Sequence, residues 1–160
     1  MAGMVRVMAT GVFDLLHPGH VAFLREAKGL GDELVVVVAR DSTAKRFKHT
    51  PITSESQRLE MVAALKPVDR AVLGNEGDIY EILDDLRPDV IALGYDQVHN
   101  EDKILEECKK RGLSRTKVVR LPKFEGDLDG TRKIVQRVAD WLALNEKLAQ
   151  VEKPLPKQKL

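Results

Sequence analysis

The stretch GVFDLLHPGH, residues 11–20, joins a strand-like segment to a helical one. It follows a run of β-forming residues, Val5 to Thr10, and it contains Pro18, a residue that is favoured at the first position of a helix. Two of the four histidines of the chain, His17 and His20, stand three residues apart at this junction. The rest of the chain shows which fold this junction belongs to and what the two histidines do there.

Strand-like and helical segments alternate along the whole chain. The strand-like runs are Val5–Thr10, Glu33–Ala39, Val68–Gly74, Asp89–Gly94 and Lys117–Leu121. Helical patterns cover residues 18–31, 53–67, 78–88, 101–112 and about 131–148. The second run is continuously apolar, which is typical of a strand that is covered on both faces. The pattern predicts a single-domain, Rossmann-like α/β fold with a doubly wound sheet of five parallel strands in the order 3-2-1-4-5.

Length and composition limit the class of protein. The chain has 160 residues, for which we expect one domain over residues 1–148 and a flexible tail over the proline- and lysine-containing residues 149–160. A formal net charge of +1 argues against a nucleic-acid partner, and no apolar run is long enough to cross a membrane. The N-terminus lacks a secretory pattern, and the single Cys108 cannot close an intrachain disulfide. We therefore expect a cytoplasmic protein.

The junction after the first strand lies where such folds bind ligands. In open α/β sheets the ligand site is outside the carboxyl ends of the strands. His17, at the helix boundary, and His20, in the first turn, share nearly one face of the helix, and Gly19 leaves the backbone accessible. Unpaired N–H groups and the helix dipole favour an anion there. A triphosphate site is thus the main interpretation, and a polar turn is the alternative. Two histidines alone are an incomplete shell for a metal.

The sequence GVFDLLHPGH closely resembles the HxGH signature of the nucleotidylyltransferase superfamily. The segments ARDSTAKRFK (39–48), QRLEMVAALKPVDRAVLG (57–74) and RPDVIALGYDQ (87–97) are similar to its cytidylyltransferase-like branch, and within it to the archaeal-type FAD synthases, which are FMN adenylyltransferases. The resemblance covers roughly Val5 to Val138. It implies that residues 1–148 form a nucleotidylyltransferase domain that transfers AMP from ATP to FMN by direct in-line attack, with release of pyrophosphate and with Mg²⁺ or another divalent metal.

The resemblance also implies roles for individual residues. His17 and His20 would stabilise the transition state, and either Lys45 or Lys48 would close over the phosphates. Asp14 and Arg58 would hold the acceptor, and the metal would be bound through the phosphates, with Asp14 as a further candidate contact. The nucleotide-binding set would be Thr10, Gly11, Val12, Phe13, His17, Gly19, His20, Gly94, Asp96, Gln97 and Thr131. By analogy with related cytidylyltransferases, we also expect a homodimer.

One segment departs from the family pattern. Before the last helix, where relatives carry two hydroxyl residues, this chain reads GDLDGTRK, so that Thr131 keeps the second hydroxyl and Gly130 replaces the first. Asp127 and Asp129 would repel a phosphate chain unless a cation offsets them. Two alternatives therefore remain: a CTP-dependent cytidylyltransferase acting on glycerol 3-phosphate or a similar polyol phosphate, and a nucleotide-binding module without turnover.

Two further expectations concern side chains at the strand ends. We expect Phe13, Phe47, Tyr95 and Phe124 to gather at one rim and to favour a large planar acceptor such as FMN. We also expect His17 and His20 to serve the reaction and not the fold, so that their replacement affects stability by no more than about 1 kcal/mol.

Overall fold

The computed structural model describes residues 3–47 and 49–151 of the chain. Five parallel strands form one sheet: β1 (Arg6–Gly11), β2 (Glu33–Val38), β3 (Arg70–Leu73), β4 (Val90–Leu93) and β5 (Lys117–Arg120). Their order is β3-β2-β1-β4-β5, which confirms the predicted topology. In the central pair, β1 runs beside β2 from Arg6 opposite Glu33 to Gly11 opposite Val38. The carboxyl ends of β1 and β2 therefore lie at the same edge.

Within the described residues, six helices connect or follow the strands. They are α1 (Pro18–Lys28), α2 (Asp41–Phe47), α3 (Glu55–Ala63), α4 (Ile82–Leu86), α5 (Glu101–Lys110) and α6 (Thr131–Val151). Helix α3 begins as the sequence predicts, because Ser54 caps it and Gln57 returns the capping bond. Helix α2 is not among the helices that the sequence predicts: the segment after the second strand forms two helical turns whose Ala44 is buried.

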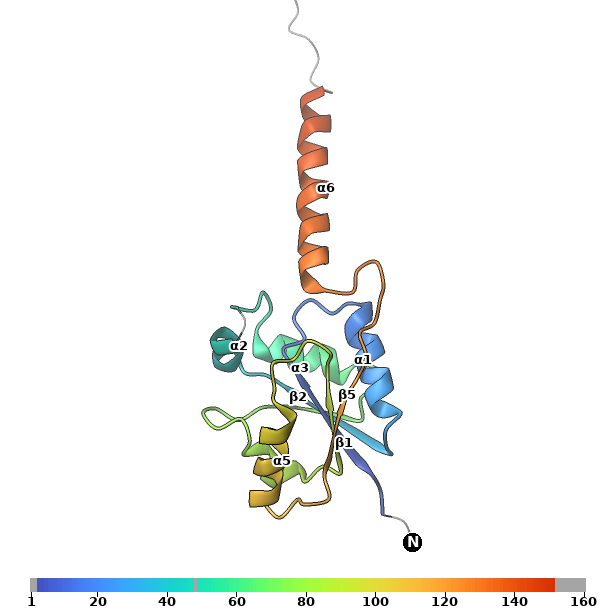
Figure 1. Ribbon diagram of the computed structural model, residues 1–160. Coiled ribbons are helices and arrows are strands. Elements are labelled where there is room, and N and C mark those ends of the chain that lie inside the picture. Colours follow the sequence, from blue (N-terminus) through green and yellow to red (C-terminus); the bar gives the residue numbers. More distant parts are fainter. Residues whose placement is uncertain (1–2, 48, 152–160) are drawn as a thin grey trace, which may run out of the picture.

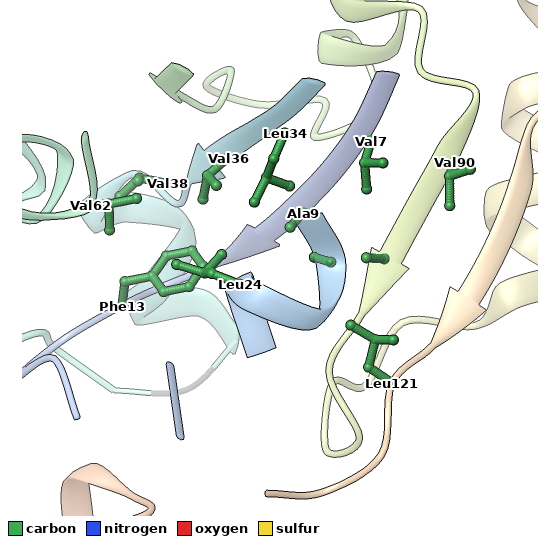
Figure 2. Packing of buried hydrophobic residues seen from close by; sticks show 12 residues of the cluster. Val7, Ala9, Phe13, Leu24, Leu34, Val36, Val38, Val62, Val90 and Leu121 are labelled. Carbon is green, nitrogen blue, oxygen red and sulfur yellow. The ribbon is translucent and has the colours of Figure 1, made fainter. Parts of the chain in front are cut away.

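The sheet is covered on both faces. On one face, side chains of β1 and β2 pack against Leu24 of α1 and Val62 of α3, and Phe13 closes this core near the strand ends (Figure 2). On the other face, Met8 and Val35 pack against α4 and α5. The side chains of Leu34 to Val38 are at most 6% exposed, which explains why that strand is continuously apolar.

Helix α6 extends beyond the rest of the fold (Figure 1). It begins at Thr131, as expected, but continues to Val151, so residues 149–151 of the predicted tail are helical. The remainder of that tail, residues 152–160, lies outside the described residues. Among the described helices, none combines the length and the apolar character that crossing a membrane requires.

Candidate active site

The loop between β1 and α1 has an unusual backbone. Phe13 (φ 56°) and Leu15 (φ 45°) both adopt left-handed conformations, which are unfavourable for residues other than glycine by about 1–2 kcal/mol. The Phe13 ring turns back over Gly11, where an added Cβ would lie only 2.9 Å from a ring carbon. Phe13 is 4% exposed and belongs to the core. Its side chain is therefore not part of an open aromatic rim, contrary to expectation.

His17 and His20 form a reciprocal cap at the start of α1. Nδ1 of His17 accepts from the backbone N–H of His20 at 3.4 Å, and Nδ1 of His20 accepts from the backbone N–H of His17 at 3.3 Å. This is the capping-box arrangement with two imidazoles in place of the usual side chains. The rings stack with their centroids 3.7 Å apart. Both histidines therefore also serve the fold, because they cap α1, and the expectation that they do not is wrong in this respect.

The cap determines where the ring protons lie. Because each Nδ1 accepts a backbone hydrogen bond, a neutral ring carries its proton on Nε2. Each ring is then a hydrogen-bond donor through the nitrogen that the cap does not use. Burial lowers the pKa of His17 below 6.5, although the charges of Asp129 and Asp96 oppose this shift. The lowered pKa favours the neutral ring, and with it the Nε2–H donor.

The segment that departs from the family pattern closes over the start of α1. A Cβ on Gly19 would lie 2.7 Å from the backbone carbonyl of Asp129 and 2.9 Å from Nδ1 of His17. Only glycine allows this approach. Close packing is therefore a second reason for glycine at position 19, besides the access to the backbone that we expected for a phosphate. The hydroxyl of Thr131 donates to the carbonyl of Asp14 at 3.0 Å. The hydroxyl proton of Thr131 is therefore already used within the protein.

The two acidic residues of this segment are neutralised by α6. Asp129 pairs with Lys133 at 2.6 Å, and Asp127 makes a two-bond contact with Arg137 at 2.7 and 2.8 Å. These partners keep the pKa of both carboxyls below the usual value, with Lys133 and Arg137 as the largest causes. The repulsion expected between this segment and a phosphate chain is therefore reduced by basic residues one or two turns into α6.

Asp14 fastens the loop before α3. Its carboxylate is 4% exposed and accepts from the backbone N–H groups of Ile52 and Thr53 at 2.8 and 3.0 Å and from the Thr53 hydroxyl at 2.7 Å. Burial raises the pKa of Asp14, but these hydrogen bonds and the charge of Arg58 outweigh it, so the net shift is downward. Both carboxylate oxygens already accept hydrogen bonds from the protein.

Arg58 is buried and fully engaged within the protein. Its guanidinium is 1% exposed and donates to the backbone carbonyls of Val12 (2.6 Å), Ala39 (2.9 Å) and Thr53 (3.2 Å). It also pairs with Asp41 at 2.6 Å. Arg58 thus links the residues that follow β1 and β2. A contact with the acceptor phosphate, as the resemblance implied, would require these bonds to break, so the structure supports a positioning role.

Asp96 and Gln97 lie in the loop after β4, at the same edge of the sheet as the histidine loop. Gln97 donates to the carbonyl of Thr10 at 2.6 Å and accepts from the N–H of Gly94 at 3.1 Å, which fixes the ends of β1 and β4 relative to each other. Asp96 is exposed, and its charge acts on His17. His17 and Asp96, which are 79 residues apart in the chain, thus meet at this edge of the sheet, as the predicted strand order requires.

The two candidate lysines differ in what the structure describes. Lys45 lies in the last turn of α2, where its side chain is exposed. Lys48 lies outside the described residues. Within residues 3–47 and 49–151, no cluster of three or more histidine, cysteine or acidic side chains is arranged to hold a metal ion.

A cavity of about 170 Å³ opens beside the end of β1, on the face of the sheet that α1 does not cover. Its wall is largely apolar and includes Ala44 and Phe47 of α2, Ile79, Leu83 and Leu93. Thr10, Gly11 and Val12 also line it, and these residues lead directly into the histidine loop. Phe47 is half exposed, whereas Tyr95 and Phe124 do not line this cavity.

The family follows from the comparison with known proteins. The family model described as cytidylyltransferase-like matches residues 8–148, which include every residue of the site described above. The chain belongs to the cytidylyltransferase-like family. Its topology and the position of its histidine pair at the start of α1 are consistent with that membership.

Relatives of this cytidylyltransferase-like chain carry a specific name. A protein from Aciduliprofundum boonei named FAD synthase is 64% identical over 138 residues, which cover 86% of this chain and 92% of the relative. FAD synthase from Archaeoglobus profundus is 54% identical over 138 residues, covering 86% and 88% of the two chains. A crystal structure described as the lipopolysaccharide core biosynthesis protein from Thermoplasma volcanium GSS1 matches with a TM-score of 0.74 and 52% identity, covering 77% of this chain and 100% of that one.

Sequence reasoning missed several residues that build this cytidylyltransferase-like site. Thr53 holds Asp14, and Arg120 donates to the carbonyls of Gly94, Gln97 and His99 and so fixes the loop after β4. Lys133 was also not singled out. Its position four residues after Asp129, at the start of a predicted helix, was a usable signal, whereas nothing local pointed to Thr53 or Arg120.

Proposed function

We propose that this protein is an FAD synthase that transfers AMP from ATP to FMN and releases pyrophosphate. The observation that carries the proposal is an apolar cavity that reaches, through Thr10 to Val12, the loop holding the histidine pair. FMN combines a flat apolar ring with a phosphate, and it can place the ring in the cavity and the phosphate beside the histidines. Glycerol 3-phosphate has no apolar ring that could fill this cavity. The FAD synthase relatives at 64% and 54% identity support the same acceptor.

The reaction needs positioning and charge stabilisation more than covalent chemistry. A phosphate oxygen of FMN attacks the α-phosphorus of ATP, the bond to the β-phosphate breaks, and pyrophosphate leaves with that bridging oxygen. The Nε2–H groups of His17 and His20 are donors to the oxygens that gain charge. The N-terminus of α1 adds backbone N–H groups and its dipole. The cap fixes both rings before substrate binds, so little reorganisation is needed during the reaction.

A divalent metal fits this site only as part of the nucleotide. The donor set within the described residues offers no three-ligand cluster, and the carboxylate of Asp14 is occupied by Ile52 and Thr53. Mg²⁺ would therefore enter with the triphosphate, where it offsets phosphate charge. Lys45, on α2 next to the cavity, is the described lysine that we assign to the phosphates, and Lys48 is the second candidate.

The proposal also covers the oligomeric state of the enzyme, its compartment and its partners. We expect it to act as a homodimer in the cytoplasm, on ATP and FMN, without a nucleic-acid partner. The apolar side chains that α6 exposes support association, and the buried, unpaired thiol of Cys108 suits a reducing compartment.

The experiment is pyrophosphate release measured with ATP or CTP against FMN or glycerol 3-phosphate. We expect turnover with ATP and FMN. Turnover with CTP and glycerol 3-phosphate, or binding of nucleotide without turnover of any pair, would replace the proposal by one of the two alternatives.

A variant of a cavity residue tests whether the flavin ring of FMN binds in the cavity. Ala44 is 1% exposed and lines the cavity, so Ala44→Leu adds three carbons where the ring is to bind. We expect weaker FMN binding with unchanged ATP binding, both measured by calorimetry, and a melting curve serves as the control for folding. Unchanged FMN affinity in the folded variant would place the ring elsewhere.

A further inference from the structure

Helix α6 has an apolar face that the described chain leaves uncovered. Six large apolar side chains on it are 46–63% exposed: Val135, Val138, Trp141, Leu142, Leu144 and Leu148. The helix points away from the sheet, so none of these residues approaches the two cores that cover the sheet (Figure 1). A monomer rarely exposes a continuous apolar face of this size unless it binds something.

The spacing along this face is that of a helix that pairs with another helix. Ile134, Val138, Trp141, Asn145 and Leu148 alternate at intervals of four and three residues. Such a heptad-like seam is the pattern of helices that pack side by side. Val135 and Leu142 widen the seam on one side and Leu144 on the other, while the opposite face carries charges of both signs.

We propose that this face docks onto the same face of a second copy of the chain. A seam that repeats on every copy satisfies a two-fold interface, in which each surface meets its equivalent. Asn145, in the middle of the seam, favours this partner over a lipid surface, because in two parallel helices the two amides face each other and can hydrogen-bond. Burying about 100 Å² on each of six side chains in two copies removes on the order of 1,200 Å², the lower limit of a stable interface.

The same helix begins inside the candidate active site. Thr131, its first residue, bonds to the carbonyl of Asp14, and Lys133 neutralises Asp129, whose carbonyl lies over Gly19. Pairing of the outer turns of α6 holds its first turn in place over the histidine loop. We therefore expect association to support activity. This link to activity rests on the proposed function, whereas association itself does not.

The fluorescence of a tryptophan in the seam can report on association. Trp141 is the single tryptophan, lies in the seam and is 63% exposed in the isolated chain. In the full-length protein at micromolar concentration, we expect a mass of about twice 17.9 kDa by light scattering and a Trp141 emission typical of a buried indole. On dilution, the emission should shift to the red and the activity per molecule should fall over the same concentration range.

A pair of matched variants tests the surface. Leu142→Glu with Leu148→Glu places two charges in the seam and leaves Trp141 in place. Ala143→Glu with Gln150→Glu adds the same charge on the opposite face, where both residues are exposed. We expect the first variant to be monomeric with red-shifted emission and at least tenfold lower turnover, and the control to behave like the wild type.

The other outcomes overturn the inference. A wild-type monomer at micromolar concentration, or a seam variant that still associates, shows that this face is not the contact between copies. A wild-type monomer that sediments with anionic phospholipid vesicles assigns the face to a lipid surface instead. Wild-type protein that associates through the seam but makes no FAD from ATP and FMN refutes the proposed function and leaves the docking surface intact.

Discussion

Replacing His17 by asparagine separates the two roles that the structure gives to this residue. Asparagine is among the best N-cap residues, and its side-chain oxygen can accept the N–H of His20 as Nδ1 does now. Its side chain is shorter than imidazole, so no donor reaches the position of Nε2–H. We therefore expect His17→Asn to keep the helix cap and to lose the contribution to turnover.

The size of each effect follows from the geometry. The cap bond to His17 is 3.4 Å long, so its loss in His17→Ala should lower the unfolding free energy by about 1 kcal/mol, within the usual 0.5–2 kcal/mol for a cap. For a chain of this size, that lowers the melting temperature by about 2–4 °C. Loss of a preorganised donor to a developing oxyanion should lower kcat on the order of 10²–10³-fold in both variants. ATP affinity should change less than kcat.

Paired thermal melts and steady-state FAD synthesis measure both effects on the same protein. Asn100→Ala is a matched control, because Asn100 caps α5 by accepting from the N–H of Lys103 at 3.0 Å. It should lose a similar amount of stability with normal kcat. Near-normal turnover in His17→Asn would refute the reasoning and leave His17 with the cap alone.

Three further results are expected. Arg58→Met should lower the unfolding free energy in urea by about 3 kcal/mol, because it leaves Asp41 and buried carbonyls without a partner; wild-type stability with a raised KM for FMN would instead support a phosphate contact. Asp14→Asn should raise the rate of amide exchange at Ile52 or Thr53, whichever faces the amide nitrogen, since that nitrogen cannot accept an N–H group; unchanged exchange at both would contradict the anchoring role. Because burial lowers the pKa of His17, the unfolded chain binds more protons below about pH 6.5, so stability should fall as the pH drops through that value, and His17→Asn should flatten this slope in melts across the range.

The architecture and the place of the site could be predicted from local patterns in the sequence. Alternating apolar runs and capped helical patterns depend on neighbours two to four residues away, so they can be recognised locally. The strand order and the start of α1 beside His17 and His20 followed from them, and so did the meeting of Asp96 with His17. The short helix α2 was missed because its basic residues also suit a solvated loop.

The roles of the polar side chains in the site could not be predicted in this way, because they depend on contacts between distant parts of the chain. The resemblance implied that Arg58 holds the acceptor, yet Arg58 is buried against carbonyls 46 and 19 residues away. Asp14 meets its partners 38 and 39 residues further along the chain. Local patterns cannot specify such partners, because burial and hydrogen bonding at these positions arise only when separate strand ends are brought together. For the same reason, the sequence predicted the helix α6, but that its apolar side chains are exposed became clear only from the fold.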